Sequence, residues 1–188
     1  MPPRIDVPAA ASYVTGMAKR SIILLPDPVL RRVAASIERV DDEVRQLADD
    51  MLETMYAAPG VGLAAPQIGV SRRLIVIDVS DKDDEKMPYV MINPTIVKRG
   101  DEPNVHEEGC LSIPDVRVEI ERPAEVVVEY LDRDGKRREL AASELLATCV
   151  QHEIDHLDGR LLIDYMSRLK REMVVKRFKR LARERDGL

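Results

Sequence analysis

The residues best suited to chemistry form one short run, Gln151-His152-Glu153-Ile154-Asp155-His156. On an α-helix, residues four apart lie one turn apart on the same face, so His152 and His156 could bind one metal ion. Glu153 is rotated about 100° from His152, which suits a carboxylate that hydrogen-bonds a water beside the metal. The spacing therefore predicts a metal-dependent hydrolytic site on a helix.

A catalytic ion of the zinc type usually takes three protein ligands, so the two histidines require a third. The candidates are His106, Cys110, Cys149 and Glu172. We favour Cys110, because a thiolate is a strong ligand for Zn(II) or Fe(II) and a nearby dication lowers the thiol pKa below about 8.5. Cys149 is expected to pack as a small apolar side chain that lines a pocket. His106 lies in a polar stretch and is expected on a surface or loop.

Length and composition indicate one domain with an aliphatic core. The chain has 188 residues, of which 45% are hydrophobic and 34% charged, with no Trp and one Phe. It contains no apolar run of eighteen residues and no secretory pattern, so we expect a cytoplasmic monomer without a membrane partner. A disulfide between the two cysteines is disfavoured in that compartment.

The helices and strands that must position the site are predicted from the spacing of apolar residues and from residues that favour turns. Residues 1–16 contain three prolines and no regular period, which predicts a disordered extension before a folded domain of residues 17–188, with Met17 as an alternative start. Helical spacing predicts an amphipathic helix from Asp41 or Asp42 to Pro59, and a second helix from Ser143 to Gly159 that carries the histidines. A third helix over residues 167–185 is strongly cationic, with nine Lys and Arg against two Glu between 168 and 185.

Runs rich in β-branched residues, bounded by turn residues, predict the strands. They span residues 73–79, 89–93, 95–98, 116–120, 125–132, 137–141 and 161–165. Strands placed before and between helices, without βαβ alternation, indicate an α+β fold. We therefore expect antiparallel or mixed β-sheets packed around a central metal-binding helix, with further helices in the N-terminal half and at the C-terminus.

Three separated motifs resemble, in content and order, the signature motifs of bacterial peptide deformylase. They are Gly-Val-Gly-Leu-Ala-Ala-Pro-Gln at 60–67, Glu-Gly-Cys-Leu-Ser at 108–112 and Gln-His-Glu-Ile-Asp-His at 151–156. The resemblance extends over about residues 17–185. It implies removal of the formyl group from the N-terminal formyl-methionine of nascent polypeptides, with release of formate. It also implies one divalent ion, typically Fe(II), with Zn, Ni or Co as substitutes.

The resemblance assigns further roles to residues of the motifs. Glu153 would be the general base, and the side-chain amide of Gln67 and the backbone N–H of Leu111 would bind the charge that develops on the formyl oxygen. Gly62 would let the loop backbone approach the substrate. Helical spacing supplies the pocket residues: Leu145, Thr148 and Cys149 share the metal-facing side of the helix with His152 and are expected, with Val61, to line an apolar slot for methionine. For Leu145, ordinary core packing is an equal alternative.

Neighbouring charges suggest support for the site. Asp155 is expected to pair with an arginine such as Arg122. For Glu108, orientation of the main chain near Cys110 and simple solvation are equal alternatives. The cationic helix over 167–185 could present a solvated face or dock on ribosomal RNA.

Two other functions are compatible with the histidine motif. The leading alternative is a zincin-like metallopeptidase that takes Glu172 as its third ligand, although the basic, solvated surroundings of Glu172 disfavour it. The other is a non-catalytic formyl-peptide- or metal-binding module. The presence of both Glu153 and Gln67 gives no support to a loss of turnover.

Overall fold

The computed structural model describes residues 18–81, 84–185 and 187. The predicted extension over residues 1–16 and the alternative start at Met17 lie outside these ranges. Within them, no helix is long and apolar enough to cross a membrane.

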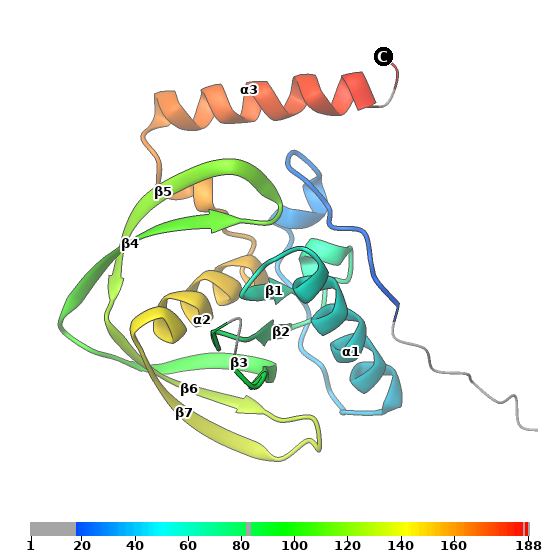
Figure 1. The fold of residues 1–188 in the computed structure, drawn as a ribbon, viewed down its shortest axis with the longest axis vertical. Helices are drawn as coiled ribbons and strands as arrows, with labels where there is room; N and C mark the ends of the chain where they lie inside the picture. Colours follow the sequence, from blue (N-terminus) through cyan, green and yellow to red (C-terminus); the bar gives the residue numbers. More distant parts are fainter. Residues whose placement is uncertain (1–17, 82–83, 186, 188) are drawn as a thin grey trace, which may run out of the picture.

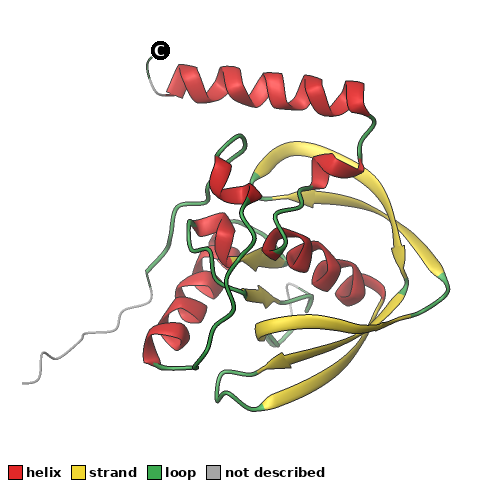
Figure 2. Cartoon of the chain, turned by 180° about the vertical axis from the view of Figure 1, so that it is seen from behind, coloured by secondary structure: helices red, strands yellow, loops and turns green. Residues whose placement is uncertain are grey.

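The strands form two antiparallel sheets (Figures 1 and 2). The larger has the order β1-β2-β3-β6-β7, and the smaller is the hairpin β4-β5. The strands are β1 Gly62–Ala64, β2 Leu74–Ile77, β3 Tyr89–Arg99, β4 Pro103–Cys110, β5 Ile113–Pro123, β6 Glu125–Leu131 and β7 Arg137–Ser143. The predicted α+β class with antiparallel sheets is confirmed.

Three α-helices surround these sheets, α1 Asp42–Ala57, α2 Glu144–Leu157 and α3 Arg168–Arg185. Three short 3₁₀ turns, η1 Pro28–Arg31, η2 Ala65–Ile68 and η3 Leu162–Tyr165, complete the fold. The predicted start of α1 is confirmed, because the Asp41 side chain accepts the Val44 N–H at 3.1 Å. Helix α2 ends as predicted before Gly159, whose φ of +72° is a left-handed conformation suited to glycine.

The larger sheet is covered on both faces near its centre. Ile75 and Ile77 of β2 face α2, whereas Leu74 and Val76 of the same strand face α1. Successive strand residues point to opposite faces, so a strand buried on both sides must be apolar at every position. This explains the uninterrupted Leu-Ile-Val-Ile sequence of β2. Helix α2 therefore lies in the interior, between the larger sheet and the β4-β5 hairpin (Figure 1).

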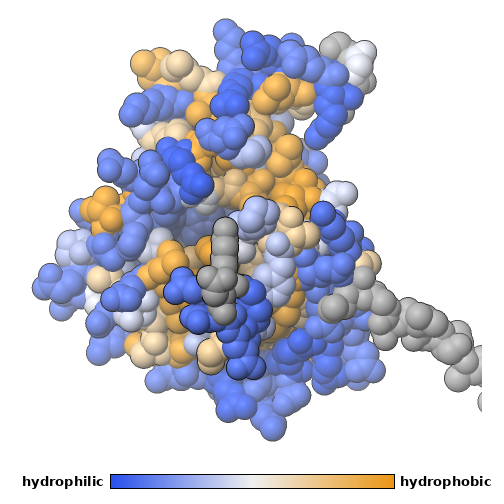
Figure 3. All heavy atoms as spheres, in the orientation of Figure 1, coloured by the Kyte–Doolittle hydropathy of each residue, from blue (hydrophilic) through white to orange (hydrophobic). Residues whose placement is uncertain are grey.

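Helix α3 covers the β4-β5 side of the molecule through a narrow contact. Among its described side chains, Phe178 is the buried one, and it packs with Ile113, Val116 and Ile120 of β5. Figure 3 shows hydrophobic atoms below α3, where it meets the body, and a largely hydrophilic surface along the helix itself. The predicted cationic helix is thus confirmed as an element, and most of it is exposed.

The structure corrects two predictions about strands and adds two strands, β1 and β4, that were not predicted. Residues 161–165 do not form a strand: η3 turns there, because the Asp164 carboxylate accepts the Leu161 N–H at 2.8 Å and the adjacent Leu162 and Ile163 are both buried. The two predicted strands around Asn93 are one strand, β3, in which Asn93 takes a φ of +51° beside a register shift. Strand β4 was not predicted, because its polar sequence carries no apolar alternation.

Candidate functional site

The strand β4 and the helix α2 bring three potential metal ligands together. Cys110 is the last residue of β4, and His152 and His156 lie one turn apart on α2. One ligand atom from each residue can be chosen so that all three lie within 4.8 Å of one another. The Cys110 Sγ atom is 3.3 Å from Nε2 of His156. The Cys110 thiol therefore lies close to both histidine rings, as the sequence interpretation required.

The orientation of the His152 ring is fixed by a contact at the nitrogen that faces away from the site. Its Nδ1 atom is 2.8 Å from Oε2 of Glu108, which leaves Nε2 for the site. Glu108 is buried and accepts two hydrogen bonds from Arg122, at 2.6 and 3.0 Å. Burial opposes ionisation, but the hydrogen bonds from His152 and Arg122 hold the pKa of Glu108 below its ordinary value. Both predictions for Glu108 were wrong, since it is neither solvated nor bonded to the main chain.

The predicted pairing of Asp155 with Arg122 is confirmed, with Nη1 of Arg122 2.9 Å from Oδ2 of Asp155. Arg122 therefore lies between two carboxylates, Glu108 on β4 and Asp155 on α2. In the β4-β5 register Arg122 lies opposite Asn104, and its guanidinium reaches Glu108 further along β4. Sequence reasoning missed Glu108 as a support for His152, because their separation of 44 residues gives no local signal.

The donor set suits a single first-row divalent ion. A thiol and two imidazoles are ligands that Zn(II), Fe(II), Co(II) and Ni(II) accept. Burial and the neighbouring His152 hold the pKa of His156 well below its ordinary value, so that ring is neutral and can donate a lone pair. For His152, burial lowers the pKa, but the contacts with Cys110 and Glu108 raise it well above the ordinary value. The residues therefore fit the metal-binding role.

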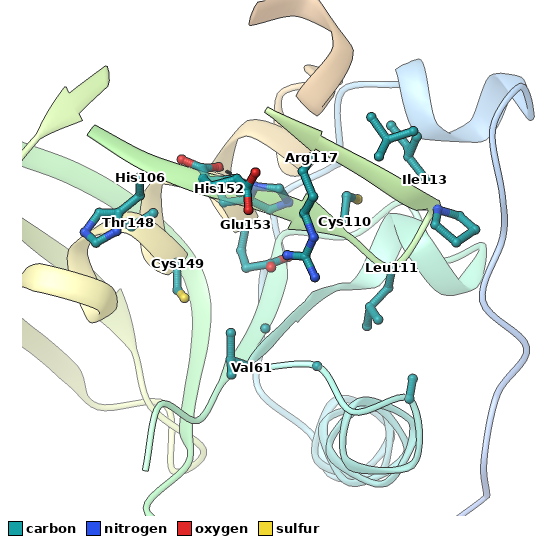
Figure 4. A pocket seen from close by; sticks show the side chains of 18 of the residues that line it. Val61, His106, Cys110, Leu111, Ile113, Arg117, Thr148, Cys149, His152 and Glu153 are labelled. Carbon is teal, nitrogen blue, oxygen red and sulfur yellow. Dashed lines mark hydrogen bonds and ion pairs between the residues drawn. The ribbon is translucent and has the colours of Figure 1, made fainter. Parts of the chain in front are cut away.

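Glu153 points into the same space from the next position on α2 (Figure 4). Its carboxylate is buried, and Oε2 has no hydrogen-bond partner among the residues that the structure describes. Burial raises the pKa of Glu153 to about 7. A Cβ atom built on Gly62 would lie 2.4 Å from Oε1 of Glu153, so the β1 backbone approaches this carboxylate as only glycine permits. Glu153 is thus poised to exchange a proton near neutral pH.

Gln67 presents a fixed hydrogen-bond donor beside Cys110. Its Oε1 atom accepts the Ala64 N–H at 2.8 Å, which sets the orientation of the amide. The Nε2 atom is 3.2 Å from Oγ of Ser112 and 3.7 Å from Sγ of Cys110. Leu111, directly after Cys110, borders the same cavity. The structure therefore places both predicted oxyanion donors next to the predicted ligand.

A cavity of about 520 Å³ opens onto these groups. Its lining contains all five predicted substrate-binding residues: Val61, Gly62, Leu145, Thr148 and Cys149. Figure 4 shows Val61 across the cavity from His152 and Glu153. Burial raises the pKa of the Cys149 thiol to about 12, so it behaves as an unreactive wall, as expected from a packing role.

Two lining residues differ from the sequence interpretation. His106 was expected on a surface or loop, but it lies on β4, is half-buried and borders the cavity, 3.0 Å from the Asn104 amide. Arg117 on β5 also borders the cavity and had been given no role. Strand β4 was not recognised from its sequence, so the alternation that turns His106, Glu108 and Cys110 to one face could not be applied.

Glu172 is remote from this arrangement. It lies on α3, is exposed, and its carboxylate pairs with Arg168 at 2.8 Å. It does not belong to the group formed by Cys110, His152 and His156. The zincin-like alternative therefore lacks its third ligand.

Comparisons with known proteins agree with this geometry. A family model described as polypeptide deformylase matches residues 19–172, which include η2, β4 and α2. A peptide deformylase from Rhizobium meliloti is 58% identical over 171 residues, covering 91% of this chain and 98% of the relative. One from Agrobacterium fabrum is 60% identical over 167 residues, covering 89% and 98%. A crystal structure of peptide deformylase from Ehrlichia chaffeensis in complex with actinonin matches with a TM-score of 0.84 and 41% identity, covering 89% of this chain and 99% of that one.

Proposed function

The chain belongs to the peptide deformylase family of metal-dependent hydrolases, which remove N-formyl groups from nascent polypeptides, and we propose which of its residues perform each part of that reaction. The substrate bond is a formamide, so hydrolysis releases formate and a free amino group. The observation that carries the proposal is that Cys110, His152 and His156 lie together, and that two of them, Cys110 and His152, border the same cavity as Glu153.

In this proposal Cys110, His152 and His156 hold one divalent ion, Fe(II), for which Zn, Ni or Co can substitute. When bound, the ion supplies Lewis acidity, which lowers the pKa of water towards about 7 and polarises a carbonyl oxygen. Glu108 keeps the His152 ring turned towards the site through its contact with Nδ1.

Glu153 acts as the general base and then as the general acid. Its unpaired Oε2 atom accepts a proton from the attacking water and returns it to the amine that leaves. The pKa of about 7 that burial gives this carboxyl suits both transfers near neutral pH.

The formyl oxygen gains negative charge as water adds to the formyl carbon. The Nε2–H of Gln67 and the backbone N–H of Leu111 donate hydrogen bonds to this oxygen. The Ala64 N–H holds the other end of the Gln67 amide, so Nε2 of Gln67 stays directed towards Cys110. Preorganised donors of this kind typically contribute about 2.7 to 4 kcal/mol each to catalysis.

The methionine side chain enters the cavity beside the reacting group. Thr148 and Cys149 are buried and form its inner wall, whereas Val61 and Leu145 are 44% and 45% exposed and form its rim. Gly62 brings the β1 backbone close to Glu153 and to the peptide.

The assignment is tested by anaerobic purification, metal analysis and a formate-release assay on formyl-Met-Ala. Cys110→Ala should lose the ion, because a thiolate ligand is removed. Glu153→Gln should retain the ion and lose turnover by about 10²- to 10⁴-fold. Full metal content in Cys110→Ala, or normal turnover in Glu153→Gln, would refute the corresponding role.

We also propose that α3 docks a monomeric enzyme on ribosomal RNA in the cytoplasm, as part of a catalytic domain that spans residues 17–188. Arg31 of η1 and three cationic residues of α3, Arg171, Lys176 and Lys179, border one groove. Phosphate neutralisation by such residues gives affinity that falls with salt.

Charge reversal tests this docking better than truncation would, because Phe178 is buried against β5. The triple variant Lys176→Glu, Lys179→Glu and Arg183→Glu changes exposed residues of one helix face. It should weaken ribosome co-sedimentation at low salt and leave turnover of formyl-Met-Ala unchanged. A control variant reverses three exposed residues elsewhere, Lys98, Arg99 and Arg137. Equal pelleting of both variants and the native chain would argue against docking through α3.

A further inference from the structure

Tyr165 is a partly exposed residue that contacts the side chains holding His152 in place. It is the last residue of η3, and its side chain is 41% exposed. Its hydroxyl donates to Oδ2 of Asp155 at 2.6 Å and lies 3.3 Å from Nη1 of Arg122. The Arg122 guanidinium carbon also lies 5.0 Å from the centre of the Tyr165 ring. Tyr165 therefore contacts Arg122 through both its hydroxyl and its aromatic face.

These contacts continue without a gap to the site. Arg122 reaches Asp155 through Nη1 at 2.9 Å and Glu108 through Nε and Nη2 at 2.6 and 3.0 Å. Glu108 in turn lies 2.8 Å from Nδ1 of His152. Arg122 and Glu108 are 7% and 6% exposed, so water cannot replace a lost hydrogen bond between these two side chains.

The orientation of Arg122 decides whether both carboxylates are satisfied. A guanidinium is planar, and its Nε and Nη2 atoms can bind both oxygens of Glu108 only when that plane is correctly placed. The Tyr165 ring restricts the plane from one side by a cation–π contact, and the hydroxyl fixes the Asp155 oxygen that binds Nη1. Without Tyr165, Asp155 would be free to turn towards water, since its side chain is 15% exposed.

We propose that Tyr165 is a positioning residue for the metal site. It holds Arg122 and Asp155 so that Glu108 keeps Nε2 of His152 directed towards Cys110 and His156. The inference rests on the proposed ligand set. Tyr165 lies behind Arg122 and does not border the cavity, so its effect on the reaction is indirect.

Two substitutions separate the contributions of the hydroxyl and the ring. Tyr165→Phe removes the hydroxyl, with its hydrogen bonds to Asp155 and from Arg122, and keeps the aromatic face, whereas Tyr165→Leu removes both the hydroxyl and the aromatic face. Tyr130→Phe is the matched control, because Tyr130 is also partly buried but lies on β6 in the larger sheet. Each protein is loaded with Co(II), and its visible absorption spectrum and its rate of metal loss to excess chelator are measured.

Tyr165→Phe should lose Co(II) about threefold faster than the native chain, and Tyr165→Leu about tenfold faster, because loss of an outer partner usually costs 10- to 100-fold in affinity and Tyr165 is one step further out. Both variants should shift the Co(II) absorption bands, which report the ligand geometry, and Tyr130→Phe should not. The double variant Tyr165→Phe with Asp155→Asn should lose metal less than threefold faster than Asp155→Asn alone, because only the hydroxyl contact with Arg122 is then left to lose.

Native spectra and native rates of metal loss in both Tyr165 variants would overturn the inference and leave the ligand set intact. If Tyr165→Leu does not fold by circular dichroism, Tyr165→Phe decides the question alone. Failure of the ligand set has a different signature, in which Cys110→Ala binds Co(II) as tightly as the native chain does.

Discussion

Two buried carboxylates near His152 are held in opposite states by their surroundings. Hydrogen bonds from His152 and Arg122 keep the pKa of Glu108 low against the effect of burial. No such partner at Oε2 of Glu153 is present among the described residues, and burial raises the pKa of Glu153 to about 7. Environments that push two pKa values apart separate a structural charge from a proton-transfer group. The first carboxylate therefore orients a ligand, and the second is free to exchange a proton.

The state of Glu153 predicts the pH dependence of turnover. A general base works only when it is deprotonated. The value of kcat/KM should therefore fall as the pH falls below about 7. A bound dication would move this acid limb to lower pH, because it favours the carboxylate. Formate release measured from pH 5 to 9 should show one acid limb in the native chain.

The same limb should disappear from the residual activity of Glu153→Gln, which has no carboxyl to titrate. Metal content must be measured at each pH, because protonation of the ligands also releases the ion. A limb that persists unchanged in metal-loaded Glu153→Gln would assign it to another group.

At the scale of elements, the site depends on how closely β1 approaches α2. Strand β1 is an edge of the larger sheet and contains Gly62. The Glu153 carboxylate occupies the space that a side chain at position 62 would need. The start of β1 therefore limits the position of the base, and the segment between α1 and β1 forms one wall of the cavity.

Gly62→Ala should displace Glu153, because the added Cβ would lie 2.4 Å from Oε1. A displacement near 1 Å can reduce the rate by about 10²-fold, so we expect a loss of kcat/KM of at least about tenfold with metal content retained. Gly100→Ala is a suitable control, because its new Cβ would meet Glu125 at 3.4 Å, an ordinary contact. Steady-state formate release and metal analysis of both variants test this. Equal activity of the two would show that Glu153 tolerates the intrusion.

At the scale of the whole molecule, the metal site joins two separately packed parts. Cys110 belongs to the β4-β5 hairpin, whose apolar side packs with η3 and Phe178. His152 and His156 belong to α2, which packs on the larger sheet. An ion bound to all three would link the hairpin to the helix across the cavity. Metal binding should therefore stabilise the folded chain as well as activate it.

Adding Zn(II) to metal-free protein should raise Tm. At a free concentration of 100 times Kd, binding adds about 2.7 kcal/mol to the free energy of unfolding. For a chain of this size that corresponds to a shift of roughly 5 to 10 °C. Differential scanning calorimetry with and without Zn(II) measures the shift. Cys110→Ala should show little of it, and a full shift in that variant would place the ion elsewhere.

The sequence alone was sufficient for the parts of the site that rest on short-range geometry. His152, Glu153 and His156 lie on one helix, so helical periodicity fixes their relative directions before any tertiary contact is known. Composition and periodicity likewise predicted α1, α2, α3 and the strands β6 and β7. The choice of Cys110 depended on ligand chemistry and on a resemblance between motifs.

The tertiary structure decided what joins residues that are distant along the chain. The bonds of Glu108 to His152 and of Tyr165 to Asp155 and Arg122 depend on the β4-β5 register and on the turn of η3, and neither leaves a periodic signal in the sequence. Most of strand β4 is exposed or half-buried, so it has no apolar alternation that could reveal it. Its one buried polar residue, Glu108, is satisfied by Arg122 of β5 and His152 of α2, and only the tertiary structure brings these partners to it.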